Sequence, residues 1–319
     1  MADSKGKKTS RPRPKAARAD ASGPIKERVR DLAWAGHHAE AIEQASAALA
    51  KSDLSVENRL DLLDLRAESF IAQGDLERAS ADADAMLELA RGAGTAALDA
   101  QAHNRLAVVQ MRRGALKAAV ASATAALNFA RRSKQLALEA TSLYRLAEAQ
   151  YRSRIDVEQA VRHALRASAV FHAHGRPSDE GRALWLVAMA RSSQGRSAEA
   201  DRASNAALAL CRQAGDLYGA GNALNMLMFN QADFAVQLQL LHQALADFEA
   251  AGYVDRQAII TGNMGIAYSR LGLYRRARRL FLRANEIHRR TGARVTQANV
   301  FTALAEVELA MGHLDGARA

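Results

Sequence analysis

The sequence predicts an all-α protein, an α-solenoid of about eight antiparallel helix pairs forming a right-handed superhelix. Just one of its four prolines lies beyond residue 25, so almost nothing interrupts helix formation. Hydrophobic residues make up 49% of the chain and aromatic residues 5%, which suits close packing of Ala- and Leu-rich helices. Glycines spaced by about 40 residues mark a recurring turn, and such self-similarity is typical of repeat proteins.

The first segment, residues 1–24, differs from the rest of the chain. It reads MADSKGKKTSRPRPKAARADASGP and contains three of the four prolines and a marked excess of basic residues. It cannot bury enough apolar surface to offset the entropy lost on ordering. We therefore predict a disordered basic tail over 1–24 and a superhelix over 25–319. A solubilising leader is the simplest interpretation of the tail, although basic tails can also contact nucleic acid or acidic lipid.

The helix pairs then follow in order, most of them marked by a glycine between two helical runs. These turn glycines are Gly36, Gly74, Gly114, Gly195, Gly272 and Gly312. Two further pairs lack the glycine, one near 147–160 with an insertion and a shortened, degenerate one near 227–239. A second set of glycines follows the helix pairs, as expected for C′ residues: Gly94, Gly175, Gly215, Gly252 and Gly292.

Small residues recur at fixed distances from the turn glycines. Alanine stands five positions after each of them, as at Ala41 and Ala277, and a small residue such as Gly265 stands seven positions before. Two helices can cross closely only where neither carries a bulky side chain. We therefore expect these positions to form the crossing point within each pair.

This pattern resembles the tetratricopeptide repeat (TPR) family over roughly residues 25–319. The unit at 258–291 matches the family's Leu, Gly, Tyr, Gly, Tyr, Ala, Phe and Ala positions with Met264, Gly265, Tyr268, Gly272, Tyr274, Ala277, Phe281 and Ala284. The period of about 40 exceeds the usual 34, as in the long repeats of bacterial signalling regulators and polarity adaptors, and the family's Trp is missing. Neither departure changes the expected fold, but both leave the ligand open.

The resemblance implies a concave binding surface lined by the first helix of each unit. Carried over to this sequence, the partner-binding groove is lined by Gln101, Asn104, Tyr144, Glu148, Tyr151, Arg182, Trp185 and Met189. Trp185 and the tyrosines are the expected aromatic anchors, since such residues are favoured at interface centres. The alternative is that these aromatic residues fill gaps between units.

No pattern in the sequence indicates catalysis, and we predict no catalytic residues, metal site or cofactor. His172 and His174 are two positions apart on a helix and point to different sides. The single cysteine, Cys211, lies in a helical run and excludes a disulfide framework. The absence of a long apolar run or a secretory signal favours a cytoplasmic protein without membrane contact.

Two functions remain. The first is a non-catalytic scaffold that binds a protein or peptide partner in the groove; because the eighth unit stops within its second helix, we expect it to be the regulatory N-terminal arm of a larger signalling protein. The alternative is a nucleic-acid-associated regulator, which would use the basic tail and an arginine patch in the seventh unit. That patch comprises Arg275, Arg276, Arg278, Arg279 and Arg283. No aromatic residues interleave with it and no nucleic-acid motif is present, so we favour the scaffold.

Overall fold

A computed structural model describes residues 22–291 and 294–313. These residues form fifteen α-helices and no strand. In chain order the helices are α1 (Ser22–Trp34), α2 (His38–Leu49), α3 (Val56–Gln73), α4 (Leu76–Ala93), α5 (Ala96–Arg112), α6 (Leu116–Ser133), α7 (Leu136–Ser153), α8 (Val157–Ala173), α9 (Pro177–Ser193), α10 (Ser197–Gln213), α11 (Leu217–Met228), α12 (Phe234–Ala250), α13 (Val254–Arg270), α14 (Tyr274–Thr291) and α15 (Arg294–Ala310).

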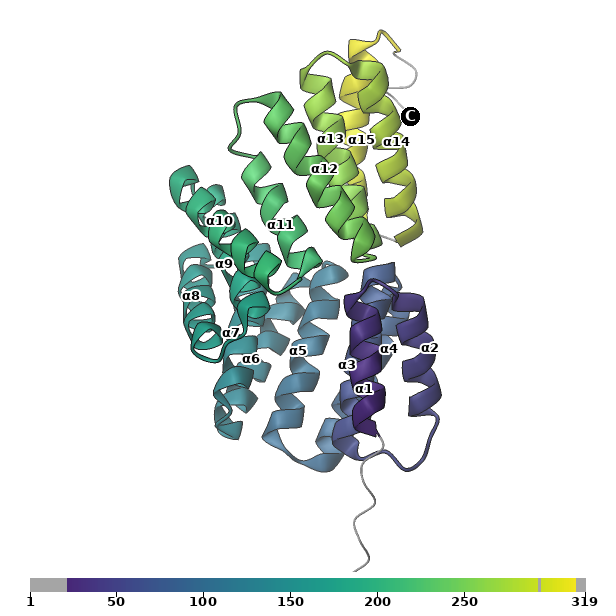
Figure 1. Ribbon diagram of the computed structural model, residues 1–319, viewed down its shortest axis with the longest axis vertical. Coiled ribbons are helices and arrows are strands. Elements are labelled where there is room, and N and C mark those ends of the chain that lie inside the picture. The colour runs from purple at the N-terminus through teal and green to yellow at the C-terminus, as the bar shows by residue number, and fades with distance from the viewer. Residues whose placement is uncertain (1–21, 292–293, 314–319) are drawn as a thin grey trace, which may run out of the picture.

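Consecutive helices pack as pairs, and the pairs follow one another in a curved stack (Figure 1). The predicted α-solenoid is confirmed, with seven complete pairs in the described residues followed by α15. α1 begins at Ser22, slightly before the predicted boundary, and the rest of the predicted tail lies outside the described residues. The predicted second helix of the eighth unit falls largely on residues 314–319, which also lie outside them.

The turns explain how units with and without glycine keep the same geometry. Gly36, Gly74 and Gly272 adopt φ values of 81°, 82° and 73°, the left-handed region that costs glycine little. The fourth unit has no glycine at its turn and uses Arg154 and Asp156 with φ of 55° and 48° instead. The Asp156 side chain accepts a hydrogen bond from the Gln159 backbone N–H and so caps α8.

The sixth unit departs from the others, as its sequence predicts. Its first helix, α11, has 12 residues, whereas the other first helices from α3 onward have 17 or 18. The chain then runs through a loop before α12 begins at Phe234. Phe229 remains exposed in this loop.

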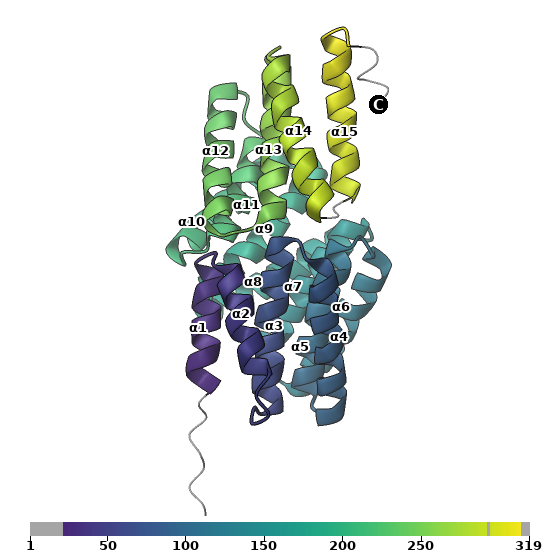
Figure 2. The same cartoon turned by 90° about the vertical axis from the view of Figure 1, so that its right-hand side faces the viewer.

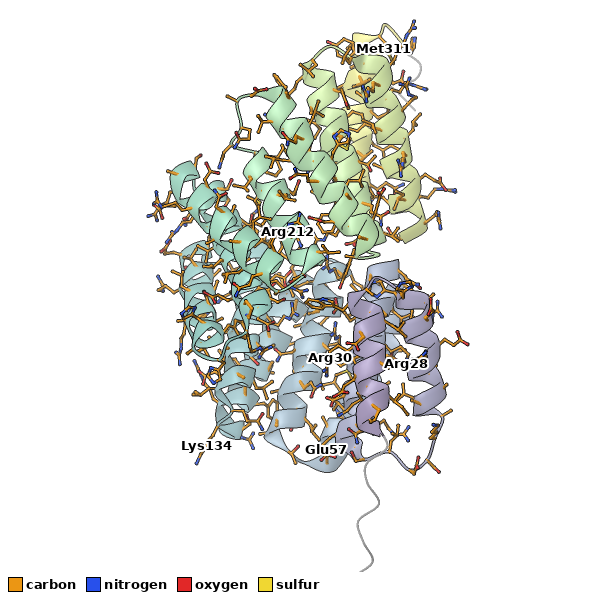
Figure 3. All side chains as sticks on the ribbon, viewed as in Figure 1. Arg28, Arg30, Glu57, Lys134, Arg212 and Met311 are labelled. Carbon is orange, nitrogen blue, oxygen red and sulfur yellow. The ribbon has the colours of Figure 1, made fainter. Side chains whose placement is uncertain are left out.

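The curvature places the first helices of the pairs on one face, which we call the inner face. The first helices α3, α5, α7 and α9 contact one another in sequence, whereas contacts between second helices are marginal at most. The largest continuous core runs from Phe70 on α3 to Ala190 on α9 and is rich in alanine. Exposed charged side chains such as Glu57 and Lys134 project outward from the ends of the pairs (Figure 3).

The solenoid turns far enough for its last units to rest on its first ones. Figures 1 and 2 show α12–α15 stacked above α1–α4. The Gly36 turn lies directly against Ala250 and Gly252, and Gly74 lies against Thr291. Ala72 of α3 joins the apolar core of α11–α13. We call this contact between the turns of the first two units and the ends of α12 and α14 the seam.

Candidate binding site on the inner face

The inner face of the second and third units is built from ion pairs. Arg105 on α5 is 8% exposed and pairs with Asp64, at 2.6 Å, and with Glu68, both on α3. Burial opposes ionisation of Glu68, but Arg105 outweighs this effect and lowers the pKa of the carboxyl well below its usual range. The two units are therefore joined by buried charges as well as by the apolar core.

A second cluster lies on α7. Glu148 accepts hydrogen bonds from Arg145 at 3.3 Å and Arg152 at 3.0 Å. Burial favours the protonated carboxyl, yet the nearby Arg152, Arg145 and Arg112 outweigh it and lower the pKa of Glu148 to about 2. Glu148 therefore stays ionised at neutral pH and holds these guanidinium groups on the inner face.

A third pair lies where α9 meets α11. Arg182 forms a fork with Asp216, with nitrogen–oxygen distances of 2.6 and 2.9 Å. Asp216 also accepts from the Gly219 backbone N–H at 2.9 Å, so one side chain caps α11 and fixes Arg182. The Arg182 guanidinium lies 5.1 Å from the centroid of the Tyr218 ring.

Side chains from distant units meet on this face because the solenoid closes at the seam. The buried His38 ring hydrogen-bonds through Nε2 to the Ala251 carbonyl oxygen at 3.0 Å. The Tyr253 hydroxyl donates to Glu68 over 2.7 Å. Arg112 pairs with Asp255 at 3.3 Å. Each of these contacts joins residues more than 140 positions apart in the sequence.

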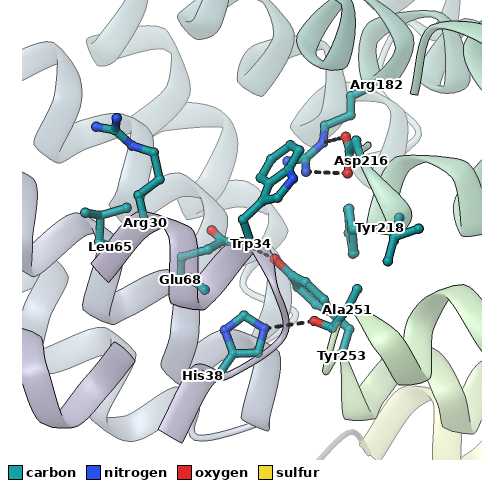
Figure 4. Close-up of a pocket in the computed structure, with 12 residues that line it drawn as sticks. Arg30, Trp34, His38, Leu65, Glu68, Arg182, Asp216, Tyr218, Ala251 and Tyr253 are labelled. Carbon is teal, nitrogen blue, oxygen red and sulfur yellow. Dashed lines mark hydrogen bonds and ion pairs between the residues drawn. The ribbon is translucent and has the colours of Figure 1, made fainter. Parts of the chain in front are cut away.

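A cavity of about 250 Å³ opens between α1, α3, α9 and α11 near the seam (Figure 4). We call it the aromatic cavity. Trp34 at the end of α1 is 46% exposed there, and Arg30 is exposed one helical turn earlier. The other walls combine apolar and charged groups: Leu65, Glu68, Arg182, Leu217, Tyr218 and Tyr253. Aromatic and apolar walls with a few fixed polar groups are typical of ligand sites.

The structure places the predicted groove residues in different environments. Arg182 lines the aromatic cavity, and the buried, neutral Tyr144 lies close enough to Arg182 and to the ionised Glu148 to interact electrostatically with both. Gln101 donates to Asp61 at 3.0 Å and Asn104 donates to Ser142 at 3.0 Å, so both bridge neighbouring units. The remaining three lie against apolar cores.

Trp185 is not available as the aromatic anchor that the sequence suggests. It is 4% exposed and packs with Ala207, Ala223 and Met226 between units. Met189 is half-buried against the same cluster, and Tyr151 packs against the main core. Trp185 instead follows the alternative stated above, in which aromatic residues fill gaps between units.

Several residues that line the aromatic cavity were not predicted from the sequence. Trp34 lies in the atypical first unit, and Tyr218 and Tyr253 lie in or beside the degenerate sixth unit. Family positions transfer least well to such units. The tripeptide DLY at 216–218 and the aromatic residue directly before α13 were the available signals.

The predicted arginine patch lies on the outer side of α14. Arg275, Arg276, Arg278, Arg279 and Arg283 are all exposed. Arg278 pairs with Glu308 at 2.5 Å, and the Arg276 guanidinium lies 4.2 Å from the centroid of the Tyr268 ring. Arg275 and Arg279 have no ion-pair or hydrogen-bond partner among the residues described.

Residues that could support metal or thiol chemistry do not gather. Within 22–291 and 294–313, no group of three or more His, Cys, Asp or Glu could hold a metal ion. His172 and His174 point to separate partners, Glu180 and the Val170 carbonyl. Burial and nearby Asp216 raise the pKa of the Cys211 thiol to about 12, so it is poorly suited to act as a nucleophile. No helix in the described part of the chain is long and apolar enough to cross a membrane.

Solved structures with a similar fold include TPR proteins, and the chain has a TPR-like repeat architecture. A Rap protein complexed with Competence and Sporulation Factor matches with a TM-score of 0.62 and 12% identity over 93% of this chain and 94% of that one. The Rap conjugation gene regulator of plasmid pLS20 in complex with the Phr* peptide gives 0.66 and 13%, over 83% and 74%. A signal-transduction ATPase with a tetratricopeptide repeat sensor from Pyrococcus horikoshii gives 0.52 and 14%, over 86% and 43%. No family model and no curated protein matches the sequence.

Proposed function

We propose that this protein is a non-catalytic interaction module that binds a peptide or helical segment on its inner face, as the regulatory N-terminal arm of a signalling protein. The observation that carries the proposal is the aromatic cavity. It combines the exposed indole of Trp34 with apolar walls from α3 and α11. A partly exposed aromatic group beside fixed polar groups is the usual composition of a side-chain pocket for a partner.

The charges around the aromatic cavity favour a ligand that carries an acidic group beside an apolar one. Arg182 is already paired with Asp216, and Glu68 accepts from Tyr253. Arg30, by contrast, lines the cavity and has no hydrogen-bond or ion-pair partner among the described residues. An acidic side chain or terminal carboxylate could pair with Arg30 while an adjacent apolar side chain contacts Trp34.

The fold comparison supports a peptide as the partner. Two of the similar structures are Rap proteins, one complexed with Competence and Sporulation Factor and one with the Phr* peptide. Both share the solenoid of this chain at 12–13% identity, which establishes similarity of fold alone. The peptide assignment therefore depends on the aromatic cavity of this chain.

The test is a selection of displayed random peptides against the wild-type protein, followed by fluorescence anisotropy with each selected peptide. We expect peptides with an apolar residue next to an acidic one, and about tenfold weaker binding to Trp34→Ala and to Arg30→Gln. Arg283→Gln on the outer side of α14 is the matched control and should bind as the wild type does. Failure to select any binding peptide would contradict the proposal, and equal binding to all variants would remove the aromatic cavity as the site.

The exposed α14 arginines keep the nucleic-acid alternative testable. A nonspecific duplex should bind weakly, and Arg279→Gln should change that binding little. Micromolar affinity that falls steeply with salt and weakens in Arg275→Gln and Arg279→Gln would instead favour the nucleic-acid function.

A further inference from the structure

A second and larger cavity lies at the seam, between the α3–α4 and α5–α6 turns on one side and α13 with the end of α14 on the other. Its volume is about 1020 Å³. We call it the arginine cavity, because its lining includes Arg112, Arg113, Arg152, Arg256 and Arg290. No Trp, Tyr or Phe is among the described residues that line it. It therefore differs in chemistry from the aromatic cavity.

Tyr218 lies between the two cavities. Its ring lines the aromatic cavity, while its hydroxyl accepts hydrogen bonds from Arg112 at 2.9 Å and Arg256 at 3.0 Å. Both arginines line the arginine cavity. Two guanidinium groups thus converge on one neutral oxygen, and among the described residues Asp255 is the only carboxylate within ion-pair distance of either, so two positive charges share one negative charge.

The carboxylates near this cavity do not balance its arginines. The described lining holds three carboxylates, Asp75, Glu77 and Asp255, against five arginines, Arg112, Arg113, Arg152, Arg256 and Arg290. Asp255 lies 3.3 Å from Arg112 and 3.8 Å from Arg256. Glu148 pairs with Arg152 and with Arg145, and neither Glu148 nor Arg145 is among the lining residues. The described lining therefore carries five positive charges against three negative ones, an excess of two.

The surroundings of Arg256 also lack enough negative charge to balance the arginines. Arg256 is 9% exposed, and its Nε is buried without a hydrogen-bond partner among the described residues. Burial opposes ionisation of the nearby Tyr218 phenol, yet Arg112 and Arg256 outweigh burial and lower its pKa. A local positive potential of this kind is costly inside a protein unless an anion or solvent offsets it.

The mouth of the cavity adds further positive charge. Arg290, near the end of α14, is exposed and has no hydrogen-bond or ion-pair partner in the described part of the chain. Arg113 pairs with Glu77 at 3.2 Å, and Asp75 pairs with Arg78. Burial lowers the pKa of His288, which therefore contributes no charge at neutral pH. Counted over all the described lining residues, the net charge is positive.

We propose that the arginine cavity binds a small phosphorylated molecule. A phosphate monoester carries a charge of about −1.5 to −2 at neutral pH, which matches the excess of two positive charges. Guanidinium groups present several donors in a planar fork that suits phosphate oxygens. The volume exceeds what a phosphate group alone needs, so the cavity accommodates the rest of a small ligand. The absence of aromatic walls in the described lining gives no platform for stacking a nucleobase.

This site is independent of the peptide proposed for the aromatic cavity. A ligand here would contact α5 and α7 on one side of the seam and α13 and α14 on the other, because its arginines come from both sides. Binding to the folded state alone stabilises that state, by an amount that rises with the logarithm of ligand concentration above the Kd. Thermal stabilisation therefore accompanies binding, whatever partner the inner face takes.

Isothermal titration calorimetry of the full chain with glycerol 3-phosphate tests the proposal, with succinate as a dicarboxylate of similar charge. We expect saturable binding of glycerol 3-phosphate and about tenfold weaker binding in Arg152→Gln and Arg256→Gln. Succinate should bind at least about tenfold more weakly than glycerol 3-phosphate, since its carboxylates lie farther apart than the oxygens of one phosphate. Arg279→Gln on the outer side of α14 should bind like the wild type.

Asp255→Asn gives a change of opposite sign that a folding defect would not produce. Removing this carboxylate raises the local excess of positive charge, and we expect glycerol 3-phosphate to bind about threefold or more tightly. The proposal is overturned if the wild type does not bind, if succinate binds equally well, or if Arg279→Gln weakens binding as much as Arg152→Gln does. Unchanged or weaker binding in Asp255→Asn also overturns it.

Discussion

The inner face and the outer side of α14 are both rich in arginine, yet they place this residue in opposite states. On the inner face Arg105 is buried, and its two carboxylate partners come from the preceding helix pair. On the outer side Arg279 is exposed and has no partner among the described residues. The residue type is the same, and the difference comes from the curvature that stacks first helices against one another.

This contrast shows what holds successive units together. An exposed arginine contributes little to stability, because water and salt screen its charge. A buried arginine with fixed partners is costly to form but very costly to break, since removal leaves uncompensated carboxylates. Buried ion pairs on the inner face therefore connect successive units, whereas the exposed arginines on the outer side are solvated and contribute little to stability.

The largest expected effect comes from removing one of these buried arginines. We expect Arg105→Met to lower the free energy of unfolding by about 3–5 kcal/mol, because Asp64 and Glu68 would lose their shared counter-charge inside the protein. Urea unfolding followed by circular dichroism measures the change. The matched outer variant, Arg279→Met, should stay within about 0.5 kcal/mol of the wild type. Similar losses in the two variants would show that the contrast between the faces has no energetic meaning.

The repeat pattern could be predicted from the sequence because it depends on local rules. The left-handed turn at Gly272 and the close crossing at Gly265 follow from residue size and spacing, and both are present. Closure at the seam could not be predicted, because it depends on small rotations that accumulate over six units. The contact between His38 and Ala251 spans 213 positions and has no local signature. For a related reason the sequence did not show that Trp185 packs between units, since its position along the helix alone does not distinguish the inner face from the contact between units.

Closure can be tested with two turn glycines that share a conformation but differ in surroundings. Gly36 and Gly114 have φ of 81° and 77°, so alanine is strained at both by about 1–2 kcal/mol. A Cβ at Gly114 meets nothing within 4 Å, whereas one at Gly36 would collide with the Ala250 carbonyl oxygen across the seam. We expect Gly36→Ala to be the more destabilising by about 1–3 kcal/mol.

Small-angle X-ray scattering then distinguishes seam opening from a general loss of stability. We expect a larger radius of gyration for Gly36→Ala and an unchanged one for Gly114→Ala. If both variants keep the wild-type radius and unfold at the same urea concentration, the seam contributes no measurable restraint on the solenoid.

A smaller effect is expected from pH, because His38 lies inside the seam. Burial lowers its pKa below the ordinary value of 6.5, although the Ala251 carbonyl and Glu68 act in the opposite direction. The unfolded chain therefore binds more protons than the folded one as the pH falls below 6.5, and stability is lost in that direction. Urea unfolding at about pH 7.5 and about pH 6 measures the loss. His38→Gln should show a smaller loss than the wild type, and an equal loss would assign the effect to the other buried histidines.

The smallest effect compares two glycines of a single helix, α13, that have different neighbours. A Cβ at Gly265 would lie 2.7 Å from the buried Phe281 ring, so alanine there should lower the melting temperature. At Gly262 the nearest atom is Cγ2 of Val300 at 3.8 Å, an ordinary contact distance. Gly262→Ala should therefore raise the free energy of unfolding by up to about 1 kcal/mol, because alanine loses less conformational entropy in a helix. A loss of stability at Gly262 would instead indicate that this position needs glycine for a close approach, for example by a ligand bound on the inner face.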